Sequence, residues 1–213
     1  MTKTELRQIC LTRQKELSSD ERSEKSSRIA LHFFECIDLS KIRRLHCFIP
    51  IEKFNEVDTS PITRSLWTNL PEVQIIAPRV NFEIAELESL IYSIKTKFVE
   101  NAWGIREPAG GELVEPATID MVIVPGLAFD RSCHRVGYGK GFYDRFLKRC
   151  RPDCIKIGLS YFDLTAEISD IHQGDMTLDF CVTPDGIFTS DTQRRKRDFS
   201  HRYTRINTDE SKS

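Results

Sequence analysis

The chain has 213 residues and a formal net charge of −1, with 39% hydrophobic and 30% charged residues. A chain of this length folds as one domain, with or without an appendage, and can bury roughly 70% of its unfolded surface without disulfide support. The balanced charge supplies no broad positive field for nucleic acid, and no stretch reaches the roughly 20 apolar residues of a membrane span.

The first quarter of the chain predicts two helices and a strand. Residues 4–17 place apolar side chains on one side of a helix, and the N-terminal stretch lacks the apolar core of a secretory signal. Ser18 and Glu21 have the spacing of a capping box, which predicts a second helix over 18–35. The run RLHCFIP at 44–50 predicts a short strand that a proline ends.

The middle of the chain contains one segment whose apolar pattern does not distinguish a helix from strands. Ser60 followed by Pro61 predicts an N-cap and a helix that continues to about residue 70. The run VQIIAP at 73–78 predicts the next strand. The apolar positions of residues 83–94 fit a helical stripe, but a pair of strands fits them as well.

Two apolar runs in the second half predict buried strands. MVIVP at 121–125 is typical of a central parallel strand, and CIKIGLSY at 154–161 has a similar character. Strands that alternate with helices predict an α/β layered fold with a largely parallel sheet. Residues 190–213 are polar, basic in their first half and without periodicity, so we expect a disordered tail after a domain that spans 1–189.

The cysteine content bears on the compartment. The chain has seven cysteines, and an odd number without a secretory signal predicts reduced thiols and a cytoplasmic protein. Cys150 and Cys154 are close in sequence, but no second pair and no nearby histidine completes a zinc site. We interpret them as ordinary, partly buried thiols.

The stretch HRVGYGKGFYDRFLKRC, residues 134–150, follows the buried strand at 121–125 and leads into a helix. Ligands in open α/β sheets bind beyond the carboxyl ends of the strands, and a glycine-rich helix N-terminus there suits phosphate. Lys140 and Arg135 add positive charge. The loop is not a Walker A motif, because Gly141 stands where a hydroxyl is required, and its glycine spacing is not that of a dinucleotide fold. The residues alone predict an anion or phosphate site, or a tight glycine turn with a surface lysine.

A longer segment, VPGLAFDRSCHRVGYGKGFYDRFL, resembles the signature of the 5-formyltetrahydrofolate cyclo-ligase family. Further elements similar to that family occur in the same order, namely KTELR, FIPIEKFNEVDT, WGIREP and DMTLDFCVTPDGI, so the likeness covers about residues 3 to 188. One position departs from it, because Cys133 stands where the family usually has glycine, and we expect the loop to bend differently there. The resemblance implies a three-layer, Rossmann-like α/β fold with a largely parallel sheet, related to those of sugar-phosphate isomerases and CoA transferases.

The resemblance also implies an activity. It implies that ATP and 5-formyltetrahydrofolate, with Mg2+, give 5,10-methenyltetrahydrofolate, ADP and phosphate. Phosphorylation turns the formyl oxygen into a leaving group, and N10 of the folate then closes the ring. Such a reaction asks the protein for positioning and charge neutralisation rather than for a covalent intermediate. We expect a monomer that binds neither membrane nor nucleic acid.

The residues that the resemblance assigns fall into four groups. Those expected to act in catalysis are Lys140, Arg135 and Tyr143. Those expected at ATP are Lys3, Arg7, Arg135, Val136, Gly137, Tyr138, Gly139, Lys140, Gly141, Phe142 and Tyr143. Those expected at the folate are Ile51, Glu56, Trp103, Tyr138, Gly139, Lys140, Gly141 and Phe142. The expected Mg2+ ligands are Asp144 and Asp179.

Each residue also has a plainer interpretation when it is taken alone. Lys3 and Arg7 fit solvated surface charges, Trp103 fits a core aromatic, and Asp144 fits a first-turn acid favoured by the helix dipole. His134 beside the loop is expected to be exposed rather than a general base. Two other functions remain open, an isomerase or CoA-transferase-like enzyme on a related fold, and a module that binds folate or docks RNA through the basic tail.

Overall fold

The computed structural model describes residues 1–189, and the expected tail at 190–213 lies outside them. A seven-stranded sheet of order β11-β10-β9-β6-β1-β2-β3 forms its centre. The strands are β1 (Arg44–Cys47), β2 (Gln74–Asn81), β3 (Glu86–Ile91), β6 (Met121–Pro125), β9 (Ile155–Leu159), β10 (Phe180–Thr183) and β11 (Gly186–Thr189). The inner strands pair in parallel, and β3 and β11 add antiparallel edges. The predicted α/β fold with a largely parallel sheet is confirmed.

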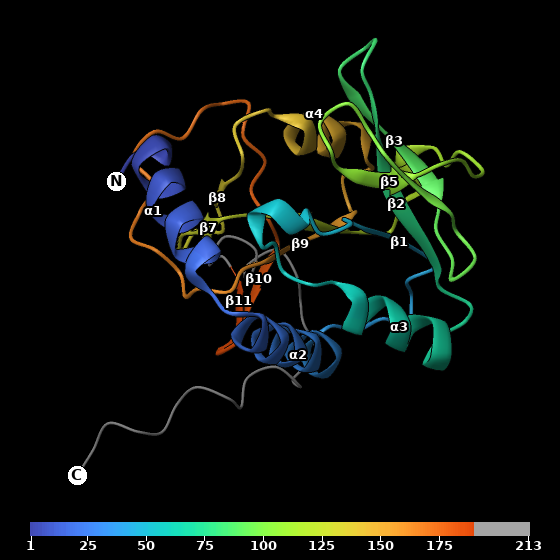
Figure 1. Ribbon diagram of the computed structural model, residues 1–213, viewed down its shortest axis with the longest axis horizontal. Coiled ribbons are helices and arrows are strands. Elements are labelled where there is room, and N and C mark those ends of the chain that lie inside the picture. Colours follow the sequence, from blue (N-terminus) through green and yellow to red (C-terminus); the bar gives the residue numbers. More distant parts are fainter. Residues whose placement is uncertain (190–213) are drawn as a thin grey trace.

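Helices cover both faces of the sheet, as Figure 1 shows. On one face lie α2 (Ser19–Cys36) and α3 (Ser60–Asn69), packed in one core cluster with alternate residues of β1 and β6 such as Leu45 and Ile123. On the other face lies α4 (Phe142–Arg149), packed in a second cluster with Val122 and Val124. Successive residues of β6 therefore enter opposite cores, which explains why its sequence is an unbroken apolar run.

The first helix, α1 (Lys3–Glu16), lies apart from these two clusters. It packs through Leu6 and Cys10 against a small hairpin of β7 (Ala128–Phe129) and β8 (Arg135–Val136). Capping boxes begin both N-terminal helices, at Thr2 and, as predicted, at Ser18. No helix within residues 1–189 combines the length and the apolar character needed to cross a bilayer.

Residues 86–91 of the undecided segment at 83–94 form a strand, so the paired-strand alternative is confirmed and the helical stripe is wrong. β3 pairs antiparallel with β2, and Leu87 and Leu90 are buried. Ile84 and Ile94, which completed the stripe, are 61% and 80% exposed. Alternate residues of an edge strand face the core, and Leu87 and Ser89, two positions apart, are both buried.

Several short elements have no strong sequence signal. They are the hairpin of β4 (Phe98–Glu100) and β5 (Arg106–Pro108) and the 3-10 turns η1 (Glu52–Phe54) and η2 (Pro116–Thr118). The N-cap of α3 is also one residue earlier than predicted. Thr59 is the cap residue, but its hydroxyl donates to the Phe48 carbonyl at 3.0 Å, and Asp58 accepts from the Ser60 N–H instead.

The loop before β8 bends as a glycine would bend it, so the expected departure at Cys133 is not found. Cys133 has φ 60, in the left-handed region, and its side chain is buried. The Asp130 carboxylate holds this turn, because it accepts from the backbone N–H groups of Ser132 and His134, each at 2.9 Å. His134 is not exposed as predicted, since its Nδ1 lies 3.0 Å from Asp130 Oδ2 and its side chain is 27% exposed.

Candidate functional site

A cavity of about 810 Å³ lies where the polypeptide leaves the carboxyl ends of β1 and β6, at Phe48 and Pro125. This is the edge at which ligands bind in open α/β sheets. Its walls include most residues that the sequence singles out, which are Lys3, Arg7, Ile51, Glu56, Trp103, Arg135, Gly137, Tyr138, Gly139, Lys140, Gly141, Phe142, Tyr143 and Asp144. The structure thus brings Lys3 and Asp144, which are 141 positions apart in the sequence, to the same cavity.

The glycine loop forms one wall. Gly139 has φ 90, and Gly141 has φ 67 and is the N-cap of α4, without a side-chain cap. Both conformations favour glycine, and the uncapped helix start leaves backbone N–H groups for a ligand. Lys140 is exposed, and within the described chain its ammonium group makes no hydrogen bond or ion pair. Val136 is the loop residue that does not reach the cavity, because it is buried against α1.

Cations from α1 close over this loop. The Arg7 Nε donates to the Gly137 carbonyl at 2.8 Å, and a Cβ at Gly139 would lie 3.4 Å from the Arg7 guanidinium carbon. Lys3 forms an ion pair with Asp175, which also lines the cavity. The i, i+4 spacing therefore presents both cations on one helix face, as the sequence predicts.

Arg135 and Tyr143 lie beneath the loop. One Arg135 nitrogen is 2.9 Å from Asp144 Oδ1, and the guanidinium lies 5.8 Å from the centre of the Tyr143 ring. The Tyr143 hydroxyl is buried without a hydrogen-bond partner among the described residues, and burial raises its pKa well above the ordinary value. A buried hydroxyl without a partner is costly, so its proton is available to a ligand.

His46 supports Tyr143 from inside the sheet. Its ring is fully buried against Tyr143 and Phe146, at centroid distances of 6.0 and 4.7 Å. Burial lowers the pKa of His46 to about 3, so the ring is neutral. Its two nitrogens have no partner within residues 1–189, and it does not line the cavity.

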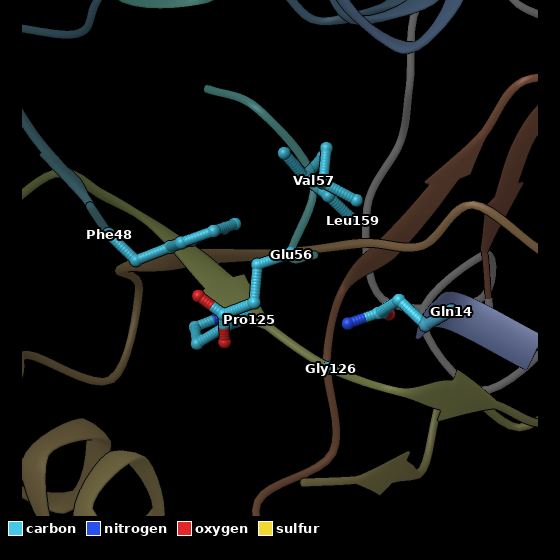
Figure 2. A pocket seen from close by; sticks show the side chains of 7 residues that line it. All are labelled: Gln14, Phe48, Glu56, Val57, Pro125, Gly126 and Leu159. Atoms are coloured by element: carbon cyan, nitrogen blue, oxygen red, sulfur yellow. The ribbon is translucent and has the colours of Figure 1, made fainter. Parts of the chain in front are cut away.

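Glu56 marks the opposite wall, and Figure 2 shows it beside Phe48 and Pro125. Glu56 as a whole is 6% exposed, and its carboxyl Oε2 accepts from the Ile51 N–H at 2.7 Å. Burial raises the pKa of Glu56 to about 7, although hydrogen bonds from Ile51 and the Tyr138 hydroxyl favour the charged form. Burial thus opposes ionisation of this carboxyl, and its charge state changes near neutral pH.

Trp103 stands at the mouth of the cavity and is not a core aromatic. It is 42% exposed, and its ring contacts Phe82 and Phe142 at 4.7 and 5.9 Å between centroids. Lys53, which also lines the cavity, donates to the Trp103 carbonyl at 2.5 Å. Two aromatic rings thus hold the indole, Lys53 fixes its backbone, and part of the indole surface stays open to a flat ligand.

The two expected metal ligands are not brought together. Asp144 lines the cavity, whereas Asp179 lies beyond it, before β10 and at the amino end of the strands. Asp179 is 2% exposed, accepts from the Lys156 N–H at 2.7 Å and lies 3.4 Å from the Lys156 ammonium. In the segment Asp-Met-Thr-Leu-Asp the first acid, Asp175, reaches the cavity instead, because the chain turns into the sheet after it.

Two polar residues of the site have no assignment from the sequence. Gln14 is 3% exposed on α1, and its amide nitrogen lies 3.3 Å from the Tyr138 hydroxyl. Glu107 on β5 is 8% exposed, lines the cavity and accepts from the Val80 N–H at 3.1 Å. The sequence contains an indication for Gln14, because this polar residue lies on the same helix face as the apolar Leu6 and Cys10. It contains no comparable indication for Glu107.

Comparisons with known proteins agree on one family. The model of the 5-formyltetrahydrofolate cyclo-ligase family matches residues 1–170. The chain is 29% identical over 188 residues to a mitochondrial 5-formyltetrahydrofolate cyclo-ligase of Arabidopsis thaliana, covering 78% of this chain and 68% of that protein. It is 27% identical to the enzyme of that name from Mycoplasma genitalium, covering 79% and 90%.

Solved structures agree with these relatives. The structure of Aquifex aeolicus 5,10-methenyltetrahydrofolate synthetase is similar with a TM-score of 0.76 and 30% identity, over 97% of this chain and all of that one (100%). The synthetase of Mycoplasma pneumoniae has the same fold, with a TM-score of 0.66 at 24% identity over 86% and 99% of the two chains.

Proposed function

The chain belongs to the 5-formyltetrahydrofolate cyclo-ligase family, and we propose that it uses ATP and Mg2+ to convert 5-formyltetrahydrofolate into 5,10-methenyltetrahydrofolate. One observation carries the proposal. A single cavity holds a cationic glycine loop on one side and, on the other, a buried carboxyl and an open indole. The first wall suits a nucleotide triphosphate, and the second suits a flat heterocycle rich in hydrogen-bond donors.

The triphosphate binds along the glycine loop. The backbone from Gly137 to Gly141 approaches the phosphate oxygens, and Lys140, free of other partners within the described residues, neutralises the transferring group. Lys3 and Arg7 cover the same phosphates from α1. Arg135 supports the loop from below, where its guanidinium contacts Asp144.

The folate binds between Glu56 and Trp103. The carboxylate of Glu56 accepts hydrogen bonds from the N–H groups of the pterin edge, and the indole covers a ring face. Ile51 fixes Glu56, because its N–H donates to the carboxyl at 2.7 Å. The ionised fraction of Glu56 is sensitive to pH near neutrality, since its pKa is about 7.

The reaction then proceeds in two steps. The formyl oxygen attacks the γ-phosphorus, and the bond to the bridging oxygen breaks to release ADP. N10 attacks the activated carbon and loses its proton, and the carbon–oxygen bond breaks to release phosphate. The protein accelerates both steps by holding the reacting atoms in line and by matching the developing charge.

Asp144 would hold the magnesium ion, which neutralises phosphate charge when it is bound. The carboxylate fits this role, because it lines the cavity beside the loop and is 24% exposed. Within residues 1–189 no group of three His, Cys, Asp or Glu side chains forms a metal cage. Such a site is typical of Mg2+ that takes its remaining ligands from phosphate and water.

A direct assay tests the proposal. The purified protein is incubated with 5-formyltetrahydrofolate, ATP and Mg2+, and the methenyl chromophore is followed with ADP release. We expect both products in equal amounts, and neither without ATP. Folate binding without product would support a folate-binding module instead. Turnover of a sugar phosphate or an acyl-CoA in place of the folate would support the isomerase or transferase alternative.

A further inference from the structure

We infer that Gln14 is a positioning residue that aims the Tyr138 hydroxyl proton at Glu56 and so keeps that carboxyl ready to accept hydrogen bonds from the folate. The inference rests on the proposed function. It concerns a residue of α1 that lies on the same helix face as Lys3, Arg7 and Leu11, at the i, i+4, i+8 and i+11 positions. The first three line the cavity, and Gln14 lies beside Glu56, with its side chain directed from α1 toward that corner of the site (Figure 2).

The amide of Gln14 is buried, so its hydrogen bonds decide whether it stabilises this corner. Its Nε2 donates to the Phe54 carbonyl at 2.6 Å and lies 3.3 Å from the Tyr138 hydroxyl. The Phe54 carbonyl can only accept, which fixes the amide nitrogen, and not the amide oxygen, on this side. The Gln14 backbone carbonyl in turn accepts from Asn55 Nδ2 at 3.2 Å.

These contacts join two walls of the site. The segment from Ile51 to Glu56 carries residues proposed for the folate, and α1 carries cations proposed for ATP. Gln14 holds that segment against α1 through both its side chain and its backbone. Its position therefore fixes the distance between the two walls as well as the local hydrogen bonds.

The direction of the Tyr138 proton follows from donor counting. A phenol has one O–H to donate, and its oxygen accepts the Gln14 N–H at 3.3 Å, so the proton is left to point at Glu56, whose charged form the Tyr138 hydroxyl favours. The Phe54 ring stacks on the Tyr138 ring at 5.0 Å and restricts its rotation. We call this chain of polar groups, from Gln14 through Tyr138 to the Glu56 carboxylate, the relay.

Few other groups act on Glu56. The Ile51 N–H donates to the carboxyl, the Tyr143 phenol interacts with it electrostatically without a hydrogen bond, and the Tyr161 hydroxyl donates to the Glu56 backbone carbonyl at 3.0 Å. The remaining residues around this corner carry no titratable group, and they are Phe48, Val57, Pro125, Gly126 and Leu159 (Figure 2). Loss of the Gln14 N–H therefore weakens one of the hydrogen bonds that favour the charged carboxyl, and its pKa rises further.

The test compares Gln14→Met, which keeps the side-chain length but removes the donor, with the wild type. The KM for 5-formyltetrahydrofolate is measured from pH 6 to 9. At pH 7 we expect KM to rise about 2- to 10-fold with a nearly unchanged kcat, the range of one hydrogen bond. At pH 9 the difference should disappear, because Glu56 is ionised in both proteins. A KM rise that persists unchanged at pH 9 would overturn the inference, since lost packing alone would produce it.

Two further variants make the result specific. Gln8→Met, on the exposed side of the same helix, is the matched control and should follow the wild-type profile. Tyr138→Phe removes the middle of the relay, so adding Gln14→Met to it should not move the pH midpoint again. A second shift in the double variant contradicts the relay.

A readout without substrate separates this inference from the proposed function. The Glu56 carboxyl is titrated by carbon NMR in the ligand-free protein, with Glu56→Gln to assign its signal. We expect a higher midpoint in Gln14→Met and in Tyr138→Phe than in the wild type. Equal midpoints would overturn the role of Gln14, whatever the enzyme assay shows. A shifted midpoint in a protein that shows no turnover would support the role of Gln14 and contradict only the proposed function.

Discussion

Arg135 Nη2 lies 2.9 Å from Asp144 Oδ1, so the guanidinium under the glycine loop and the carboxylate proposed for the metal are already bound to each other. The Arg135 side chain is 7% exposed and that of Asp144 is 24% exposed. Asp144 Oδ1 also accepts the Met176 N–H at 3.2 Å, which leaves Oδ2 for a cation. The carboxylate is thus oriented before any ligand arrives.

The metal assignment predicts different outcomes at the two aspartates. Asp144→Asn should raise the Mg2+ concentration needed for half-maximal turnover by about tenfold or more, the scale seen when even outer partners of metal ligands are replaced. Its fold should persist, because an amide oxygen still accepts the Met176 N–H. A Mg2+ titration of turnover, with a thermal melt, measures both effects.

Asp179→Asn should act on stability instead. It leaves the buried Lys156 ammonium without its charge partner, which costs about 3–5 kcal/mol of unfolding free energy. Urea unfolding measures this loss. If Asp179→Asn keeps wild-type stability and raises the Mg2+ requirement, the acid belongs to the metal site after all and the segment before β10 must move on binding.

Lys140→Ala should lower kcat by about 100- to 1000-fold, the usual cost of removing one group that stabilises transition-state charge. Its unfolding free energy should stay within about 0.5 kcal/mol of the wild type, because the side chain is exposed and makes no contact that the fold needs. Lys148→Ala, a lysine on the exposed side of α4, is the control. An active Lys140→Ala enzyme would mean that the γ-phosphate lies elsewhere.

Glu56 should make the protein less stable as the pH rises from about 4 to 7. The folded protein keeps the Glu56 proton up to a pKa of about 7, whereas an unfolded glutamate loses it near 4.3. The native state binds more protons across this window, so the unfolding free energy falls with pH, by roughly 4 kcal/mol in total.

Urea unfolding at several pH values checks this sign. Glu56→Gln should remove the slope between pH 4.5 and 7, and Glu52→Gln, on the exposed side of the same segment, controls for the lost charge. Equal slopes in the wild type and Glu56→Gln would show that burial does not raise the pKa of this carboxyl.

Cys133 has a left-handed φ of 60, which costs a residue with a Cβ about 1–2 kcal/mol. Cys133→Gly should therefore be more stable than Cys133→Ala by roughly 1 kcal/mol, because only the first removes the strain. At Cys10, inside α1, the order should reverse by about the same amount. Thermal melts of the four variants measure this, and alanine favoured at both positions would contradict the left-handed turn.

The sequence predicted those helices and strands for which a single local pattern was sufficient. The capping box at Ser18 and the β-branched run of β6 were sufficient, because local hydrogen bonding and burial on both faces each leave a distinct pattern. Residues 83–94 could not be decided, since apolar residues at Leu87 and Ile91 suit a helix face and an edge strand equally. Only pairing with β2, a contact made in three dimensions, separates the two.

The residues of the candidate site also differ in how far the sequence could predict them. Residues within the glycine loop were predictable because one short segment supplies them together. Asp179 and Asp175 are four positions apart in the same motif, and nothing in their spacing says which one reaches the cavity. Gln14 could not be assigned, because its role depends on Tyr138, which approaches it only after α1 docks on β8.

The way α1 is attached has a consequence for heat inactivation. The helix supplies Lys3, Arg7 and Gln14 to the site, yet it buries only Leu6, Cys10 and Gln14 and joins neither cluster that packs on the sheet. Elements with few buried contacts open before the whole molecule unfolds. Turnover should therefore be lost at a lower temperature than the one at which the sheet unfolds. Bound nucleotide should slow proteolytic cleavage within the first 16 residues. On heating, the protein would thus lose the part of its site that α1 supplies while the sheet and the helices packed on it are still folded.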